Sequence, residues 1–213
     1  MAFYNSINDG NNFVISFTPN PQQDFGVFAK GYARAASVLA EHLLEKPRFS
    51  DYEAYPIVFL YRQAFELYLK GLYYKAGLIS FFKGNQSVDC QFVYRHWLKP
   101  LAETFQKLCK VLFLSDQDLL QLADKVRKYA VEFDQIDSDS FGYRYPIDKK
   151  GNPSTNHNQV VNLLALHNSM RELLGELEIV DFGFDIKAAQ AQEIYEIIVE
   201  AQAIIASENG ETG

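Results

Sequence analysis

The hydrophobic pattern of the chain is strongest from Ile57 to Tyr74, where apolar side chains occupy nearly the whole circumference of a predicted helix. At about 100° per residue, its main polar residues fall within a single arc of roughly 100°: Arg62, Gln63, Glu66 and Lys70. A surface helix shows the opposite proportion, a narrow apolar stripe on a polar cylinder. We therefore expect a central buried helix over about residues 56–76. Arg62, Glu66 and Lys70 form a line along it that we call the charged seam.

Five further stretches carry apolar residues at helical spacing: 25–43, 101–112, 119–136, 160–177 and 188–205. Asn20-Pro21 is a helix-start signal for the first stretch, and Ser50 with Glu53 is a capping box for the buried helix. Pro56 either kinks the opening turn of that helix or restarts it. The sequence thus predicts an all-α bundle of about six helices around the central one.

Two segments interrupt the helical pattern. Asp181-Phe-Gly-Phe-Asp185 is predicted to be a joint between the last two helices. Residues 137–158 are dense in Asp, Ser, Gly, Pro and Asn, but their aromatic residues indicate a long loop that is ordered against the body. We expect one domain over residues 1–207, with an irregular arm at 1–19 and a disordered tail at 208–213.

Composition narrows the class of protein. The 213 residues carry a formal net charge of −7, which argues against a surface coated by nucleic acid but not against a local basic groove. Cys90 and Cys109 lack metal-ligand spacing and suggest no disulfide framework, so we expect a reducing cytoplasm, no metal and no cofactor. No signal peptide or run of eighteen apolar residues is present, so we expect no membrane association.

The charged seam has two interpretations. Its residues are spaced i, i+4 and i+8, so they can form an ion-paired ladder on one helix face. Alternatively, they form a binding or catalytic site with polar residues from elsewhere. His96, beside Arg95 and Trp97 at a helix entrance, is one such residue. The others come from the loop: Asp137, Arg144 and Tyr145, where the guanidinium can stack between two tyrosines and reach the seam.

Three blocks within residues 25–180 occur in order: Tyr61-Arg-Gln-Ala-Phe-Glu-Leu-Tyr-Leu-Lys70, His96-Trp-Leu-Lys-Pro-Leu101 and Phe133-Asp-Gln-Ile-Asp-Ser-Asp-Ser-Phe-Gly-Tyr-Arg-Tyr-Pro-Ile-Asp148. Together they resemble the HEPN-type helical domains of prokaryotic defence systems. The resemblance implies an all-α bundle and a homodimer. It also implies a metal-independent ribonuclease, or a relative that binds RNA or nucleotides, in toxin–antitoxin or phage-defence systems.

The chain departs from that family in one respect. HEPN ribonucleases carry an Arg followed by a His after four to six residues, and no Arg here has a His at that spacing. We therefore expect a non-catalytic protein that binds a nucleotide, RNA or a protein partner through Arg62, Glu66, Lys70, His96, Asp137, Arg144 and Tyr145. One alternative is a metal-independent endoribonuclease with a composite site of His96, Arg62 and Arg144. The other is a purely structural or interaction module, which a closed network around Arg62 would favour.

Overall fold

The computed structural model describes residues 25–84, 96–136, 142, 147, 150–154 and 160–210. These residues form five helices: α1 (Phe25–Leu44), α2 (Asp51–Phe82), α3 (Leu98–Leu112), α4 (Gln117–Ile136) and α5 (Leu163–Gly210). Within the described part the only β feature is an isolated bridge between Ile147 and Pro153. The all-α prediction is therefore confirmed there. The expected arm at 1–19 and the helix start at Asn20-Pro21 lie outside the described residues, as does most of the long loop.

α2 begins where the capping box predicts. The Glu53 carboxylate accepts a hydrogen bond from the backbone N–H of Ser50 at 2.8 Å. That bond, together with Lys46, lowers the pKa of the Glu53 carboxyl. Pro56 lies inside the helix, so it does not restart it. α2 also continues through Gly77 to Phe82, beyond the expected end, because residues on both sides of the glycine are buried and their packing outweighs its low helix propensity.

The last two predicted helices are one helix, because the expected joint at 181–185 is helical in α5. Lys75 of α2 explains this continuity. Its ammonium lies 2.7 Å from a carboxylate oxygen of Asp181 and 2.7 Å from one of Asp185, two residues one turn apart. Phe184 between them is buried in the core. α5 runs on to Gly210, so residues 208–210, which were expected in the tail, are helical.

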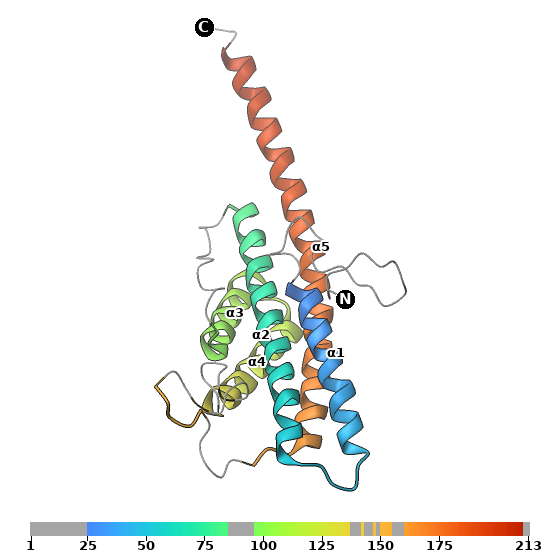
Figure 1. Cartoon of the computed structure of the whole chain (residues 1–213). Coiled ribbons are helices and arrows are strands. Elements are labelled where there is room, and N and C mark those ends of the chain that lie inside the picture. Colours follow the sequence, from blue (N-terminus) through green and yellow to red (C-terminus); the bar gives the residue numbers. More distant parts are fainter. Residues whose placement is uncertain are drawn as a thin grey trace, which may run out of the picture.

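The helices pack as two groups that share α2. α1, α2 and the first half of α5 lie side by side, and α3 pairs with α4 against α2 (Figure 1). The second half of α5 extends past the end of α2, well clear of the bundle (Figure 1). Among the described helices, none combines the length and apolar character needed to cross a membrane.

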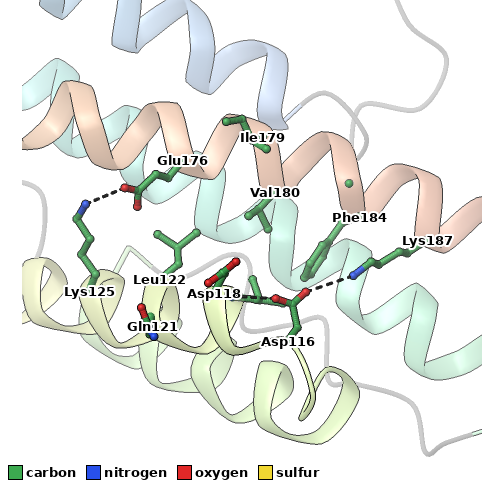
Figure 2. Close-up of a pocket in the computed structure, with 12 residues that line it drawn as sticks. Asp116, Asp118, Gln121, Leu122, Lys125, Glu176, Ile179, Val180, Phe184 and Lys187 are labelled. Atoms are coloured by element: carbon green, nitrogen blue, oxygen red, sulfur yellow. Dashed lines mark hydrogen bonds and ion pairs between the residues drawn. The ribbon is translucent and has the colours of Figure 1, made fainter.

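α4 and α5 enclose an open groove of about 680 Å³ (Figure 2). Its apolar lining comes from both helices: Leu119, Leu122, Ile179, Val180 and Phe184. Ion pairs stand at its two ends, Lys125 with Glu176 at 3.0 Å and Lys187 with Asp116 at 3.8 Å. The groove is thus an apolar channel between charged ends.

Candidate functional site

The charged seam lies on the face of α2 that turns into the bundle. Arg62 and Glu66 have 0% exposure, and Lys70 has 5%. Helical spacing places the three side chains one above the other, as the sequence predicts. Because isolated charges are costly to bury, each of them needs fixed partners. The structure shows where these partners come from.

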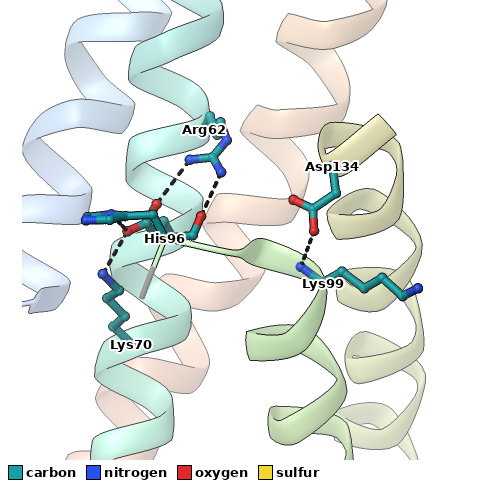
Figure 3. Close-up of polar contacts among 6 residues, drawn as sticks. Arg62, Lys70, His96, Lys99 and Asp134 are labelled. Atoms are coloured by element: carbon teal, nitrogen blue, oxygen red, sulfur yellow. Dashed lines mark hydrogen bonds and ion pairs between the residues drawn. The ribbon is translucent and has the colours of Figure 1, made fainter. Parts of the chain in front are cut away.

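Glu66 is the centre of a closed network; its partners Arg62, Lys70 and His96 are labelled in Figure 3. One of its oxygens, Oε2, lies 3.1 Å from Nη1 of Arg62. The other, Oε1, lies 2.7 Å from Nζ of Lys70 and 2.7 Å from Nδ1 of His96. Arg62 Nη2 also donates a hydrogen bond to the backbone carbonyl of His96 at 2.8 Å. The seam therefore holds His96, two residues before the start of α3, against α2 by both its side chain and its backbone.

The network also fixes the charge of Glu66. Burial by itself raises the pKa of the Glu66 carboxyl, since it disfavours the charged form. Lys70, Arg62 and His96 act in the opposite direction and outweigh burial, so the pKa of Glu66 lies below its usual value. Glu66 is consequently a carboxylate at neutral pH, and it balances positive charge that α2 would otherwise bury alone.

His96 is the exposed member of the network. Its side chain is 56% exposed, whereas the carboxylate that it contacts has no exposure. An ionised carboxylate can only accept hydrogen bonds, so the Nδ1 atom of His96 carries the proton in this contact. The other ring nitrogen, Nε2, is then left to exchange a proton with a group in solution. This is the arrangement of a carboxylate-oriented general base.

At the start of α3, close to His96, a backbone N–H group is already hydrogen-bonded within the protein. The backbone N–H of Lys99 donates to the Asp134 carboxylate at the end of α4, at 2.9 Å (Figure 3). Asp134 thus binds the first turn of α3. Trp97 is 43% exposed beside it. One helix end that could attract an anion is thus already occupied by a carboxylate.

The structure brings together four of the seven predicted site residues: Arg62, Glu66, Lys70 and His96. The other three, Asp137, Arg144 and Tyr145, lie outside the described residues, so their expected approach to the seam stays a prediction. In the described part of the chain, no group of three or more His, Cys, Asp or Glu side chains is placed to hold a metal ion.

A second buried polar contact, between Tyr61 and His167, could not be predicted from the sequence. Nδ1 of His167 in α5 lies 2.7 Å from the hydroxyl of Tyr61, one residue before the seam. His167 Nε2 lies 3.8 Å from a carboxylate oxygen of Glu41 in α1. These contacts join α1, α2 and α5 on the side of α2 next to the seam. The sequence alone does not show whether a single histidine in a helical stretch is buried or exposed, because that depends on the tertiary arrangement.

Comparisons with protein-family models, with curated proteins and with solved structures found no match to this chain. Its function must therefore be argued from the geometry above.

Proposed function

We propose that this chain is a non-catalytic, HEPN-like helical module that works by associating with protein, and that its charged seam is an internal support. The observation that carries the proposal is the zero exposure of Arg62 and Glu66. A cation that holds a phosphate must reach solvent, and the Arg62 side chain does not. Its Nη atoms instead contact the Glu66 carboxylate and the His96 carbonyl.

Ion pairs within α2 also neutralise the charges of the seam. Every charge of the seam has an opposite charge within 3.1 Å on the same helix. An open ligand site would leave at least one cation facing solvent. The closed network instead supports the third interpretation of the sequence, an interaction module whose charges are satisfied internally.

One observation favours a second candidate function, a metal-independent ribonuclease centred on His96. The Glu66 carboxylate orients the imidazole, and more than half of the His96 side chain is exposed. In such a reaction His96 Nε2 takes the proton of an RNA 2′-hydroxyl, and the 2′ oxygen bonds to phosphorus. The bond from phosphorus to the 5′ oxygen then breaks, and the 5′ oxygen takes a proton from water. The difficulty is charge: Lys70, which shares the Glu66 carboxylate with His96, is only 5% exposed, and Arg62 has no exposure, so neither cation is placed to stabilise the phosphorane.

RNA cleavage by the full chain with EDTA present throughout separates the two candidates. We expect no cleavage by the wild-type protein beyond that of buffer. His96→Gln serves as the test variant, and His42→Gln in α1 is the matched control, because His42 is also exposed but lies far from the seam in sequence and is absent from its contacts.

Cleavage by the wild type that falls by roughly 10²–10⁴-fold in His96→Gln, the usual contribution of a general base, and survives in His42→Gln would overturn the proposal. Products ending in 2′,3′-cyclic phosphate would identify the reaction. Cleavage that persists equally in both variants would indicate a contaminating nuclease, because neither histidine would then matter.

A further inference from the structure

The groove between α4 and α5 has a helix along each side. The two helices run antiparallel there, because Lys125 within α4 pairs with Glu176 of α5, while Asp116, just before α4, pairs with Lys187 further along α5 (Figure 2). From Glu176 to Lys187 the groove is about 16 Å long, which is three turns of a helix. The residues of α5 that line it repeat at helical spacing: Glu176, Ile179, Val180, Gly183, Phe184 and Lys187.

The groove has an apolar base and is open to solvent. Leu119, Leu122 and Phe184 are buried in its lining, whereas Ile179 is 74% exposed. Gly183 leaves room above the base, because a Cβ atom added there would meet nothing within 4 Å. An open apolar groove of this length marks an interaction site.

A helix suits this groove better than an extended chain. An extended peptide needs a sheet edge to pair its backbone N–H and C=O groups, and both walls of the groove are helices. A helix pairs these groups internally and can place apolar side chains, repeating at i, i+3, i+4 and i+7, between α4 and α5. The expected occupant is therefore an amphipathic helix of at least three turns.

The net charge of α5 selects the kind of helix. α5 contains nine acidic and two basic residues, a net charge of −7, which equals that of the whole chain. A second copy of the chain would bring the same acidic helix to the groove. Nucleic acid and anionic membranes need basic residues on the protein that binds them. Charge thus favours a basic polypeptide as the occupant.

The two ends of the groove show where basic residues would bind. Each end has two carboxylates for one ammonium group, so one carboxylate is in excess. Lys or Arg residues eleven positions apart lie on one face of a helix, about 16 Å from each other, and match this separation. The charged groups are Glu172, Glu176 and Lys125 at one end, and Asp116, Asp118 and Lys187 at the other.

We propose, resting on the proposed function and extending it, that the groove between α4 and α5 binds an amphipathic helix of a different, basic protein. The apolar face of that helix covers Leu119, Leu122 and Ile179. A Lys or Arg at each end of the face pairs with the excess carboxylate there. Gly183 lets the partner helix approach the backbone of α5 closely.

Fluorescence anisotropy of two labelled synthetic peptides with the full chain tests the proposal. Both peptides are alanine-rich helices of about 18 residues, with Leu at i+3, i+4, i+7 and i+8. One carries Lys at i and i+11, and the other carries Glu at both positions. We expect saturable, one-to-one binding of the Lys peptide and at least about tenfold weaker binding of the Glu peptide.

Gly183→Leu tests whether the peptide lies in the groove. The new side chain occupies the open space above the base and should weaken binding of the Lys peptide at least about tenfold, because it takes the place of a peptide side chain. Gly31→Leu in α1 is the matched control: it is another exposed helical glycine at which an added Cβ meets nothing, and it lies outside the groove. Binding by this control should equal that of the wild type. Circular dichroism checks that both variants stay helical.

Asp118→Lys tests the role of charge at one end of the groove. It should reduce the preference for the Lys peptide over the Glu peptide at least about tenfold, because like charges then oppose each other. Asp51→Lys is the control, since Asp51 is also an exposed acidic residue in the first turn of a helix, and its loss has the same cost at the helix start. This control should keep the preference of the wild type.

Three results would each overturn this inference: no saturable binding of the Lys peptide up to about 100 μM chain, equal binding of the two peptides, or equal effects of a groove variant and its control. RNA cleavage separates this failure from that of the proposed function. A chain that binds neither peptide and does not cleave RNA would leave the internal role of the seam standing. A chain that binds the Lys peptide and cleaves RNA through His96 would overturn the proposed function and leave the groove as a binding site.

Discussion

At the scale of single residues, Glu66 decides what the charged seam is. Its two oxygens take three partners, Arg62, Lys70 and His96, within 3.1 Å. The Glu66 carboxylate balances the charge of two buried cations, Arg62 and Lys70. Together with Arg62, it also fixes His96 at the entrance of α3. A buried ion pair is weak evidence of net stabilisation, but the loss of one member is costly because the others remain buried.

Glu66→Gln removes the negative charge and keeps the shape of the side chain. The free energy of unfolding at pH 7 should fall by about 3–5 kcal/mol, the scale for breaking a buried pair from one side. Glu178→Gln is the control, since Glu178 pairs with Lys30 on the surface and its side chain is 47% exposed; it should change stability by less than about 1 kcal/mol. Urea denaturation measures both. A loss below about 1 kcal/mol for Glu66→Gln would show that the network does not hold the fold.

The same carboxylate predicts a dependence on pH. The folded pKa of Glu66 lies below its usual value of 4.5. Its contribution is therefore fully present above pH 4.5 and is lost as the pH falls through the lowered pKa. The difference in unfolding free energy between wild type and Glu66→Gln should be constant from pH 7 to 5 and shrink in more acidic solution. A difference that grows as the pH falls below 4.5 would contradict this.

At the scale of helices, the sequence predicts what depends on local chemistry. The Ser50–Glu53 box marks the start of α2, as expected. The ends and joints depend on partners far away in the chain. Gly77 and the Asp181–Asp185 stretch both look like helix ends in isolation, but core packing and the ammonium of Lys75 keep them helical.

The sequence likewise predicts only part of the candidate site. The alignment of Arg62, Glu66 and Lys70 follows from helical spacing and could be predicted. Whether the seam is open could not, because that depends on where the chain before α3 lies. The bond from Arg62 to the backbone carbonyl of His96 leaves no trace in the identity of any residue.

Two glycines test how closely the helices approach. A methyl group at Gly26 in α1 would overlap the carboxylate of Asp181, which Lys75 holds in place, whereas one at Gly175 in α5 would meet nothing. Gly26→Ala should therefore destabilise the protein by about 1–3 kcal/mol through overpacking. Gly175→Ala should stabilise it by up to about 1 kcal/mol, since alanine is the better helix former. Thermal unfolding measures both, and a stabilising Gly26→Ala would show that α1 and α5 are further apart.

At the scale of the whole molecule, buried and exposed features are divided between two regions. The bundle satisfies its seam charges internally, while the projecting half of α5 presents apolar side chains to solvent. Arg62 and Glu66 could take part in chemistry only if the bundle opened, because both side chains are fully buried. The exposed apolar side chains of α5 thus lie at the end of the molecule away from the capped start of α2 (Figure 1).

The most direct test of the closed seam is the stability of the full chain with and without phosphate ligands. A ligand that binds only the folded protein at 100 times its Kd raises the free energy of unfolding by about 2.7 kcal/mol. We expect no increase with inorganic phosphate, ATP or a single-stranded RNA oligonucleotide, each compared with chloride at equal ionic strength. A stabilisation by any of these ligands that disappears in Lys70→Met would contradict a closed seam and identify it as a binding site.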